Sequence, residues 1–276
     1  MPQYNCRIII RTLALVLVLQ QHAFCQTDTV RVLPDTMNLN PSGIANTAFG
    51  IGEKLVFDIG YGFITAGEAF MSVTDTMIMQ GRSTYKVLFE VNSLPAFSWI
   101  YRVRDRYETY IDAEGIFPWR FEQHIREGGY KRDFTADFDQ RNHIARTSEG
   151  NYRIPEFVHD IMSAFYYMRT QNYDNRRPGE RFHLKNFYKD SAYALDVKYL
   201  GRQEIEVEAG TFKCIILEPL VKEGGLFKSE GRIIVWLSDD ERKIPVKVST
   251  QVVIGTIDVE LREYSGLRGP IPAKVK

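Results

Sequence analysis

The central part of the chain alternates apolar and polar residues with a period of two. Leu55, Phe57 and Ile59 alternate with Lys54 and Asp58, and β-branched and aromatic residues recur between Gly, Asp and Asn residues. The helical crossovers that parallel strands need are missing, so the pattern predicts antiparallel hairpins. Further segments of this kind lie at residues 85–91, 130–138, 192–200, 211–218, 231–237 and 252–261.

One segment departs from the period of two. From Val158 to Met168, apolar residues fall at positions i, i+3, i+4, i+7 and i+10, which predicts an amphipathic helix over about 158–169. A single helix of this kind needs a sheet against which to bury its apolar face. We therefore expect an all-β, mainly antiparallel fold, a curved sheet or open barrel-like architecture, with this helix packed on it or closing one end.

The first 25 residues have the pattern of a secretory signal peptide. Arg7 and Arg11 precede or interrupt a short apolar stretch, and Ala23 and Cys25 are small residues where a signal peptidase reads the chain. The stretch is too short to span a membrane, which takes about 20 apolar residues. We expect cleavage after Cys25, export, and no transmembrane span in the mature protein. Lipid attachment at Cys25 and an uncleaved anchor are the alternatives.

The rest of the chain divides into three parts. Residues 26–48 are rich in Thr, Asn, Asp and Pro without a sustained period, which predicts a linker. We expect residues 49–264 to form one antiparallel β domain, without an obvious internal repeat, and residues 265–276 to form a tail with several Gly and Pro residues.

Composition excludes several classes of protein. The chain has 276 residues, 44% of them hydrophobic, with 35 basic and 35 acidic side chains, which rules out a disordered tail and a multi-span membrane protein. The balanced charge argues against a nucleic-acid partner. Cleavage would leave 33 basic and 35 acidic residues, since Arg7 and Arg11 are lost, and only Cys214. Cys214 lies in an alternating segment, so we expect a buried thiol and no internal disulfide.

Signatures of catalysis are missing from the sequence. It contains no G-x-S-x-G, H-E-x-x-H or G-x-x-x-x-G-K-[ST] motif, and no two histidines of the mature chain lie within four residues of each other. His159, Asp160 and Ser163 are close in sequence, but Asp160 is better explained as a carboxylate in the first turn of the helix. We predict no catalytic residue, no metal site and no cofactor.

The strongest candidate for binding is a row of arginines. On a strand, Arg102, Arg104 and Arg106 present their guanidinium groups on one face, and Trp99 precedes them. Arginine is well suited to carboxylates, phosphates and acidic sugars, so these four residues are candidates for binding an anionic ligand. The alternative is an exposed face that pairs with acidic residues of a neighbouring strand.

Three ordered motifs resemble a family of exported Gram-negative envelope proteins that is classified only as a domain of unknown function. They are residues 57–69 (FDIGYGFITAGEA), 159–169 (HDIMSAFYYMR), and 235–240 (VWLSDD) with 244–246 (IPV). The resemblance covers about residues 49–264. It implies a barrel-like antiparallel β architecture and a periplasmic or outer-membrane-associated location, and it supplies no catalytic residues.

These observations favour a non-enzymatic exported protein of the cell envelope that binds an amphipathic or anionic component, such as a lipid or polysaccharide. One alternative is a structural or accessory subunit that binds an envelope protein. The other is an envelope hydrolase whose site is assembled from residues far apart in the sequence.

Overall fold

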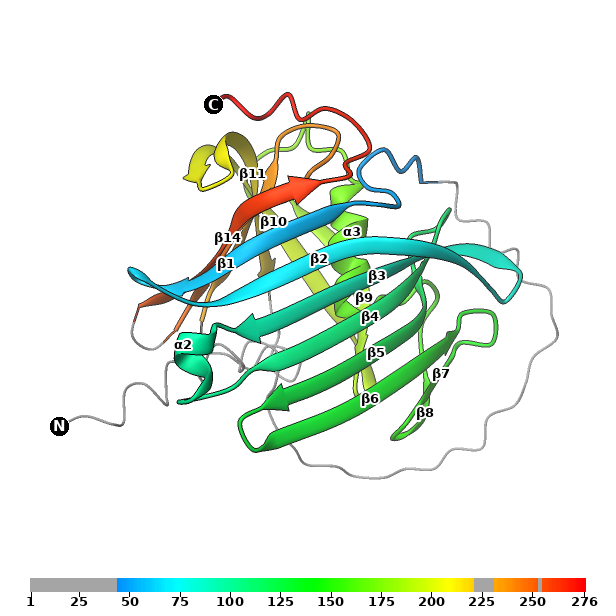
Figure 1. Ribbon diagram of the computed structural model, residues 1–276. Coiled ribbons are helices and arrows are strands. Elements are labelled where there is room, and N and C mark those ends of the chain that lie inside the picture. Colours follow the sequence, from blue (N-terminus) through cyan, green and yellow to red (C-terminus); the bar gives the residue numbers. More distant parts are fainter. Residues whose placement is uncertain (1–43, 221–230, 253–254) are drawn as a thin grey trace.

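One curled antiparallel sheet makes up most of the molecule (Figure 1). The computed structural model describes residues 44–220, 231–252 and 255–276. In this part, fourteen strands are ordered β8-β7-β6-β5-β4-β3-β2-β1-β14-β13-β12-β11-β10-β9, and every neighbouring pair is antiparallel. The predicted all-β, antiparallel fold is therefore confirmed.

The strands are β1 (Lys54–Tyr61), β2 (Ile64–Met79), β3 (Arg82–Ser93), β4 (Arg104–Asp112), β5 (Pro118–Glu127), β6 (Tyr130–Asp139), β7 (Ile144–Thr147), β8 (Gly150–Arg153), β9 (Arg181–Tyr188), β10 (Ser191–Val207), β11 (Gly210–Leu220), β12 (Ile233–Ser238), β13 (Pro245–Gln251) and β14 (Thr256–Ser265). Within the described ranges, two helices accompany them, α2 (Pro95–Ser98) and α3 (Ile161–Arg169).

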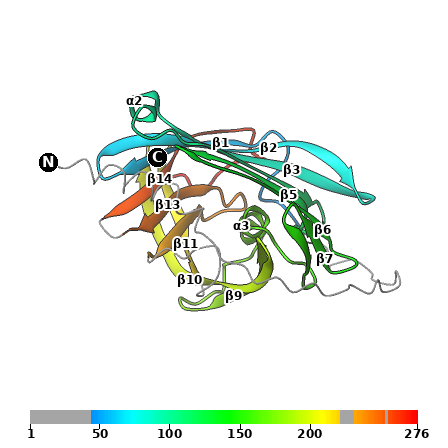
Figure 2. The same ribbon diagram turned by 90° about the horizontal axis from the view of Figure 1, so that it is seen from below.

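The curl of the sheet places α3 between two layers of strands. Figure 2 shows the β1–β6 layer on one side of the helix and strands β9–β11 on the other. Alternation along each strand supplies the apolar inner surface: Leu55, Phe57 and Ile59 of β1 are buried, whereas their neighbours are more exposed.

The two edge strands of the sheet approach each other without forming a ladder among the described residues. The Phe187 ring on β9 packs against Phe138 of β6 and Tyr152 of β8, with ring centroids 5.7 and 6.0 Å apart. His159 extends this contact, because its backbone bonds to Lys185 O and Phe187 N at 2.8 and 2.7 Å. The result is an open barrel joined by side chains and one short segment.

The structure corrects two predicted boundaries. The helix begins at Ile161 and not at 158, because His159 forms an isolated parallel bridge with Asn186 and Asp160 is the N-cap. The strand predicted over 252–261 begins only at Thr256, because the Val252 N–H bonds to Gly255 O at 3.0 Å ahead of it.

The C-terminal residues pack against the domain. Ala273 O accepts from Lys213 N at 2.9 Å, and Val275 N donates to Thr211 O at 2.8 Å, so the predicted tail lines the start of β11. Cys214, on the same strand, is buried as predicted. The predicted signal peptide and most of the predicted linker lie outside the described residues. Within the described ranges, no helix combines the length and apolar character needed to cross a membrane.

Candidate ligand cavity

A cavity of about 260 Å³ lies between α3 and the inner face of the sheet. Met162, Ala164 and Phe165 line it from the helix. Strands from both layers complete it, for example with Met71 of β2 and Val235 of β12. Asp105 is the one charged residue among its described lining residues. The cavity exceeds the roughly 150 Å³ of an engineered apolar cavity that binds benzene.

The N-terminus of α3 is fixed by a capping box. Asp160 Oδ1 accepts from Met162 N and Ser163 N at 2.7 and 2.8 Å, and Ser163 Oγ accepts from Asp160 N at 3.0 Å. The other carboxylate oxygen, Oδ2, accepts from Thr109 Oγ1 of β4 at 2.6 Å, which ties the helix to the sheet. Burial raises the pKa of Asp160 to about 6, although the hydrogen bonds that its carboxylate accepts act in the opposite direction and lower the pKa.

The arrangement of His159 offers no nucleophilic site. Its ring is buried against Tyr167, with centroids 4.9 Å apart, and burial lowers its pKa to about 3. Ser163 and Asp160 already bond to each other as the helix cap. In the described part of the chain, no three His, Cys, Asp or Glu side chains are grouped so as to hold a metal ion.

A buried ion pair holds the C-terminal end of α3. Arg169 donates from Nη1 and Nη2 to the two Glu53 carboxylate oxygens at 2.7 and 2.8 Å, and both side chains are 0% exposed. The guanidinium lies 5.4 Å from the Phe49 ring centroid and 5.0 Å from that of Tyr166. It also donates to Arg242 O at 3.1 Å. These contacts fix the helix against the segment that leads into β1.

A second polar cluster lies on the inner face of β4 and β5. Asp105 and Tyr107 line the cavity from β4, while Gln123 and Glu127 point inward from β5. All four are at most 5% exposed. Burial raises the pKa of Glu127 to about 9, an effect to which the nearby Asp105 charge adds, and burial also raises the pKa of Asp105.

The predicted arginine row lies on the opposite, outer face. Strand β4 begins at Arg104, so Arg102 lies just before the strand. The side chains of Arg102, Arg104 and Arg106 are all exposed, whereas Val103 and Asp105 between them are buried. The predicted common face is thus present, but these side chains do not line the cavity. Trp99, at the end of α2, is 81% exposed.

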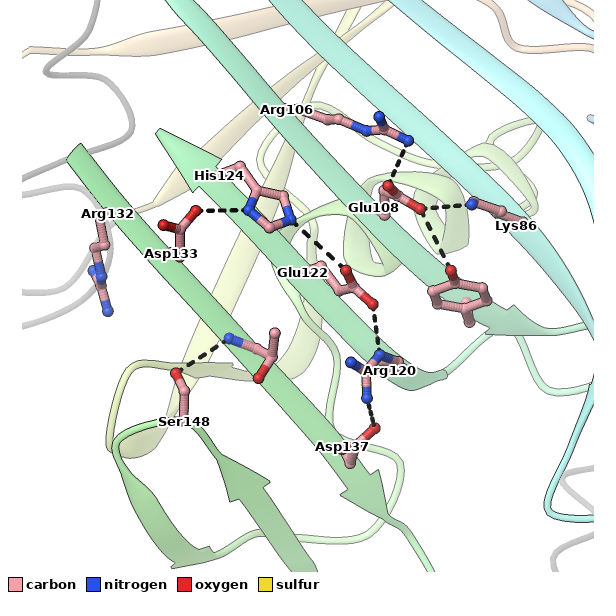
Figure 3. Close-up of polar contacts among 12 residues, drawn as sticks. Lys86, Arg106, Glu108, Arg120, Glu122, His124, Arg132, Asp133, Asp137 and Ser148 are labelled. Carbon is pink, nitrogen blue, oxygen red and sulfur yellow. Dashed lines mark hydrogen bonds and ion pairs between the residues drawn. The ribbon is translucent and has the colours of Figure 1, made fainter. Parts of the chain in front are cut away.

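Ion pairs cover the outer face around Arg106 (Figure 3). Arg106 and Lys86 both reach Glu108, at 2.6 and 2.7 Å. Further along the sheet, Arg120 pairs with Glu122 and Asp137, and His124 lies 2.7 Å from Asp133. Arg102 and Arg104 form no ion pair with the described acidic residues. Arg106 therefore pairs with an acid of its own strand β4, and not with one of a neighbouring strand as the alternative expected.

Sequence reasoning missed the cavity and the inner polar cluster. One signal was available, because Asp105 shares the inward face of its strand with Val103 and Tyr107, where a lone carboxylate is unusual. The partner carboxyl of Glu127 is 22 residues away and follows only from the pairing of β4 with β5.

The fold and the cavity define a barrel-like antiparallel β protein with an apolar interior space. The chain belongs to the DUF3108 family, described as a protein of unknown function, whose model matches residues 56–262. This confirms the resemblance to a domain of unknown function. Among curated proteins, none matches the sequence.

Two solved structures show similarity to the chain. The β-barrel-like protein of domain of unknown function DUF1849 from Brucella abortus is 10% identical, with a TM-score of 0.51, covering 79% of this chain and 99% of its own. A DUF1089 family protein from Pseudomonas aeruginosa is 14% identical, with a TM-score of 0.38, covering 75% of this chain and 95% of its own. Because the sequence identity is this low, the likeness to the Brucella abortus protein supports the fold only.

Proposed function

We propose that this protein is an exported, non-enzymatic binding protein of the cell envelope that holds the apolar part of an amphipathic lipid. The observation that carries the proposal is the cavity of about 260 Å³ between α3 and the sheet, with its almost wholly apolar lining. A lipid chain that enters this space removes apolar surface from water, which contributes about 25 cal/mol per Å² of buried apolar surface.

The sequence supports the location. The basic and apolar segments before Cys25 have the pattern of a signal peptide, and the described residues offer one buried thiol, Cys214, and no disulfide. A periplasmic or outer-membrane-associated site would give the protein access to lipids. Polysaccharide, the other candidate ligand, fits the apolar lining less well, because sugar hydroxyls need hydrogen-bonding partners.

The exposed arginine row supports contact with an anionic surface. Arg102 and Arg104 stand free of acidic partners in the described part of the chain, and Trp99, three residues before Arg102, is exposed. Basic side chains next to an exposed aromatic ring are typical of residues that meet a lipid headgroup region. In this proposal the outer arginines contact the envelope surface, while the cavity on the other face holds the lipid chain.

Native mass spectrometry of the mature protein, purified from its own envelope fraction, tests the proposal. We expect a bound mass that is lost on denaturation. Ala164→Leu adds three carbons to the cavity lining and should lower the bound fraction at least fivefold. The matched control is Ala192→Leu on β10, a half-buried position outside the cavity. A bare wild-type chain would contradict lipid binding and favour the accessory-subunit alternative.

Stability measurements on the same two variants test whether the cavity is empty space. If the larger side chain of Ala164→Leu occupies the void, the ligand-free variant gains up to about 2 kcal/mol, because each buried methylene contributes about 0.8 kcal/mol. In a filled core the same change would cost about 1–3 kcal/mol through overpacking. A loss of that size in Ala164→Leu would argue against the cavity.

A further inference from the structure

The inner polar cluster has an unbalanced set of hydrogen-bonding groups. Asp105 Oδ1 accepts from Arg126 N at 2.8 Å, and the carboxyl groups of Asp105 and Glu127 lie within hydrogen-bonding reach of each other. The Gln123 amide lies close enough to the Tyr107 hydroxyl to affect its pKa. The geometry of a hydrogen bond is nevertheless not met there, so three buried oxygens have no partner among the described residues: Tyr107 Oη, Gln123 Oε1 and Glu127 Oε1.

The basic side chains of β4 and β5 point away from this cluster. Carboxylate and amide oxygens only accept hydrogen bonds, and an unpaired buried polar atom costs about 1–3 kcal/mol. Alternation along β4 and β5 places Arg104, Arg106 and Arg126 on the outer face, where Arg126 pairs with Asp133 at 2.7 Å. Arg132 of β6 shares the inner face but pairs with Glu149 at 3.0 Å, so no ion pair joins the cluster to a cation among the described residues. The cluster borders the cavity through Asp105 and Tyr107.

A ligand head group that binds this cluster from the cavity must satisfy three conditions. It has to donate several hydrogen bonds, carry positive charge and be attached to an apolar body that fits the neighbouring cavity. A primary ammonium on an alkyl chain meets all three, since it has three donors and no acceptor. A carboxylate or phosphate head would instead meet the negative charge of the acid pair and bring further acceptors.

We propose that the cavity selects amphiphiles with a primary amine head, whose ammonium is held at the cavity wall by Asp105, the partner of Glu127 in the acid pair, while the apolar chain lies along α3. This inference rests on the proposed function and names the ligand class. At neutral pH the acid pair keeps one proton, because burial disfavours two charges, so a single ammonium neutralises its remaining charge.

Three probes of equal chain length test the inference: decylamine, decanol and decanoate, each titrated calorimetrically below its micelle concentration at pH 7. We expect decylamine to bind at least tenfold more tightly than decanol, and decanoate to bind more weakly than decanol. In Asp105→Asn/Glu127→Gln, the affinity for decylamine should fall at least tenfold, while that for decanol stays within about twofold. Retained decanol binding also shows that the double variant is folded.

The control variant is Glu122→Gln, on the outer face of the same strand β5. It should leave the affinity for decylamine unchanged. That result would exclude binding of the ammonium to acidic residues on the outer surface. Equal affinity of amine and alcohol would overturn the inference and leave the proposed function standing, with the cluster then occupied by water only. Binding of none of the three probes would contradict both.

Discussion

Replacing Glu53 by Gln tests whether the buried ion pair with Arg169 holds α3 in place. The substitution keeps the shape of the side chain but removes its charge, so the guanidinium stays buried without a counter-ion. Both side chains are 0% exposed, and the two contacts are 2.7 and 2.8 Å long. Removing one partner of such a pair typically costs about 3–5 kcal/mol.

The other contacts of Arg169 place the expected loss of unfolding free energy at the low end of that range. The guanidinium keeps its hydrogen bond to Arg242 O at 3.1 Å and its contacts with the Phe49 and Tyr166 rings. A cation–ring contact of this kind contributes about 0.5–2 kcal/mol. We expect Glu53→Gln to lower the free energy of unfolding by about 3 kcal/mol and the Tm by roughly 6–12 °C.

Urea denaturation followed by circular dichroism measures the effect. The matched control is Asp58→Asn, which breaks the partly exposed Asp58–Arg262 pair, 2.6 Å long, and should cost less than about 1 kcal/mol. Arg169→Met combined with Glu53→Gln should cost less than the sum of the two single variants, because the second change removes the stranded charge. A cost for Glu53→Gln no larger than the control would refute the reasoning.

Three further predictions concern other parts of the molecule. Burial raises the pKa of Glu127 to about 9, above its unfolded value of about 4.3, so its contribution to stability is lost as pH rises from about 4 to 9. Urea titrations at pH 6, 7 and 8 should show the wild type losing up to about 1.4 kcal/mol of unfolding free energy per pH unit relative to Glu127→Gln. A difference between the two proteins that does not change with pH would contradict this prediction. Replacing Arg102, Arg104 and Arg106 by Gln should change the free energy of unfolding by less than about 1 kcal/mol, since all three side chains are exposed. The same variant should bind anionic vesicles more weakly in a sedimentation assay, and unchanged vesicle binding would contradict the proposed role of these arginines. Reducing agent should leave the Tm of the mature protein unchanged, because Cys214 is buried and burial raises the pKa of its thiol to about 12; a clear drop would indicate a disulfide.

Local patterns in the sequence predicted about half of the strands and the longer helix. Alternation predicted strands that the structure confirms, such as β3 around residues 85–91 and β6 around 130–138, and helical spacing predicted α3. The boundaries were less accurate where a tertiary contact decided them. The helix starts at Ile161 because the preceding residue, Asp160, is held as its cap by Thr109 of β4.

The candidate site depended on contacts between distant residues. Glu53 and Arg169 are 116 residues apart, and no periodicity links them. Asp105 and Glu127 meet because β4 and β5 pair in one particular register. The outer arginine row, by contrast, follows from alternation within one short segment, so its common face was predictable although its relation to the cavity was not.

The sequence by itself determined which residues of each strand face inward, where a helix forms and that Cys214 is buried, because these properties depend on neighbours a few positions away. Only the tertiary structure decided that the inward residues leave a cavity. Apolar side chains fill a core or enclose a space according to the distance between the layers that carry them. Here that distance is set by α3, which the Asp160 cap and the Arg169 ion pair fix between the two halves of the sheet.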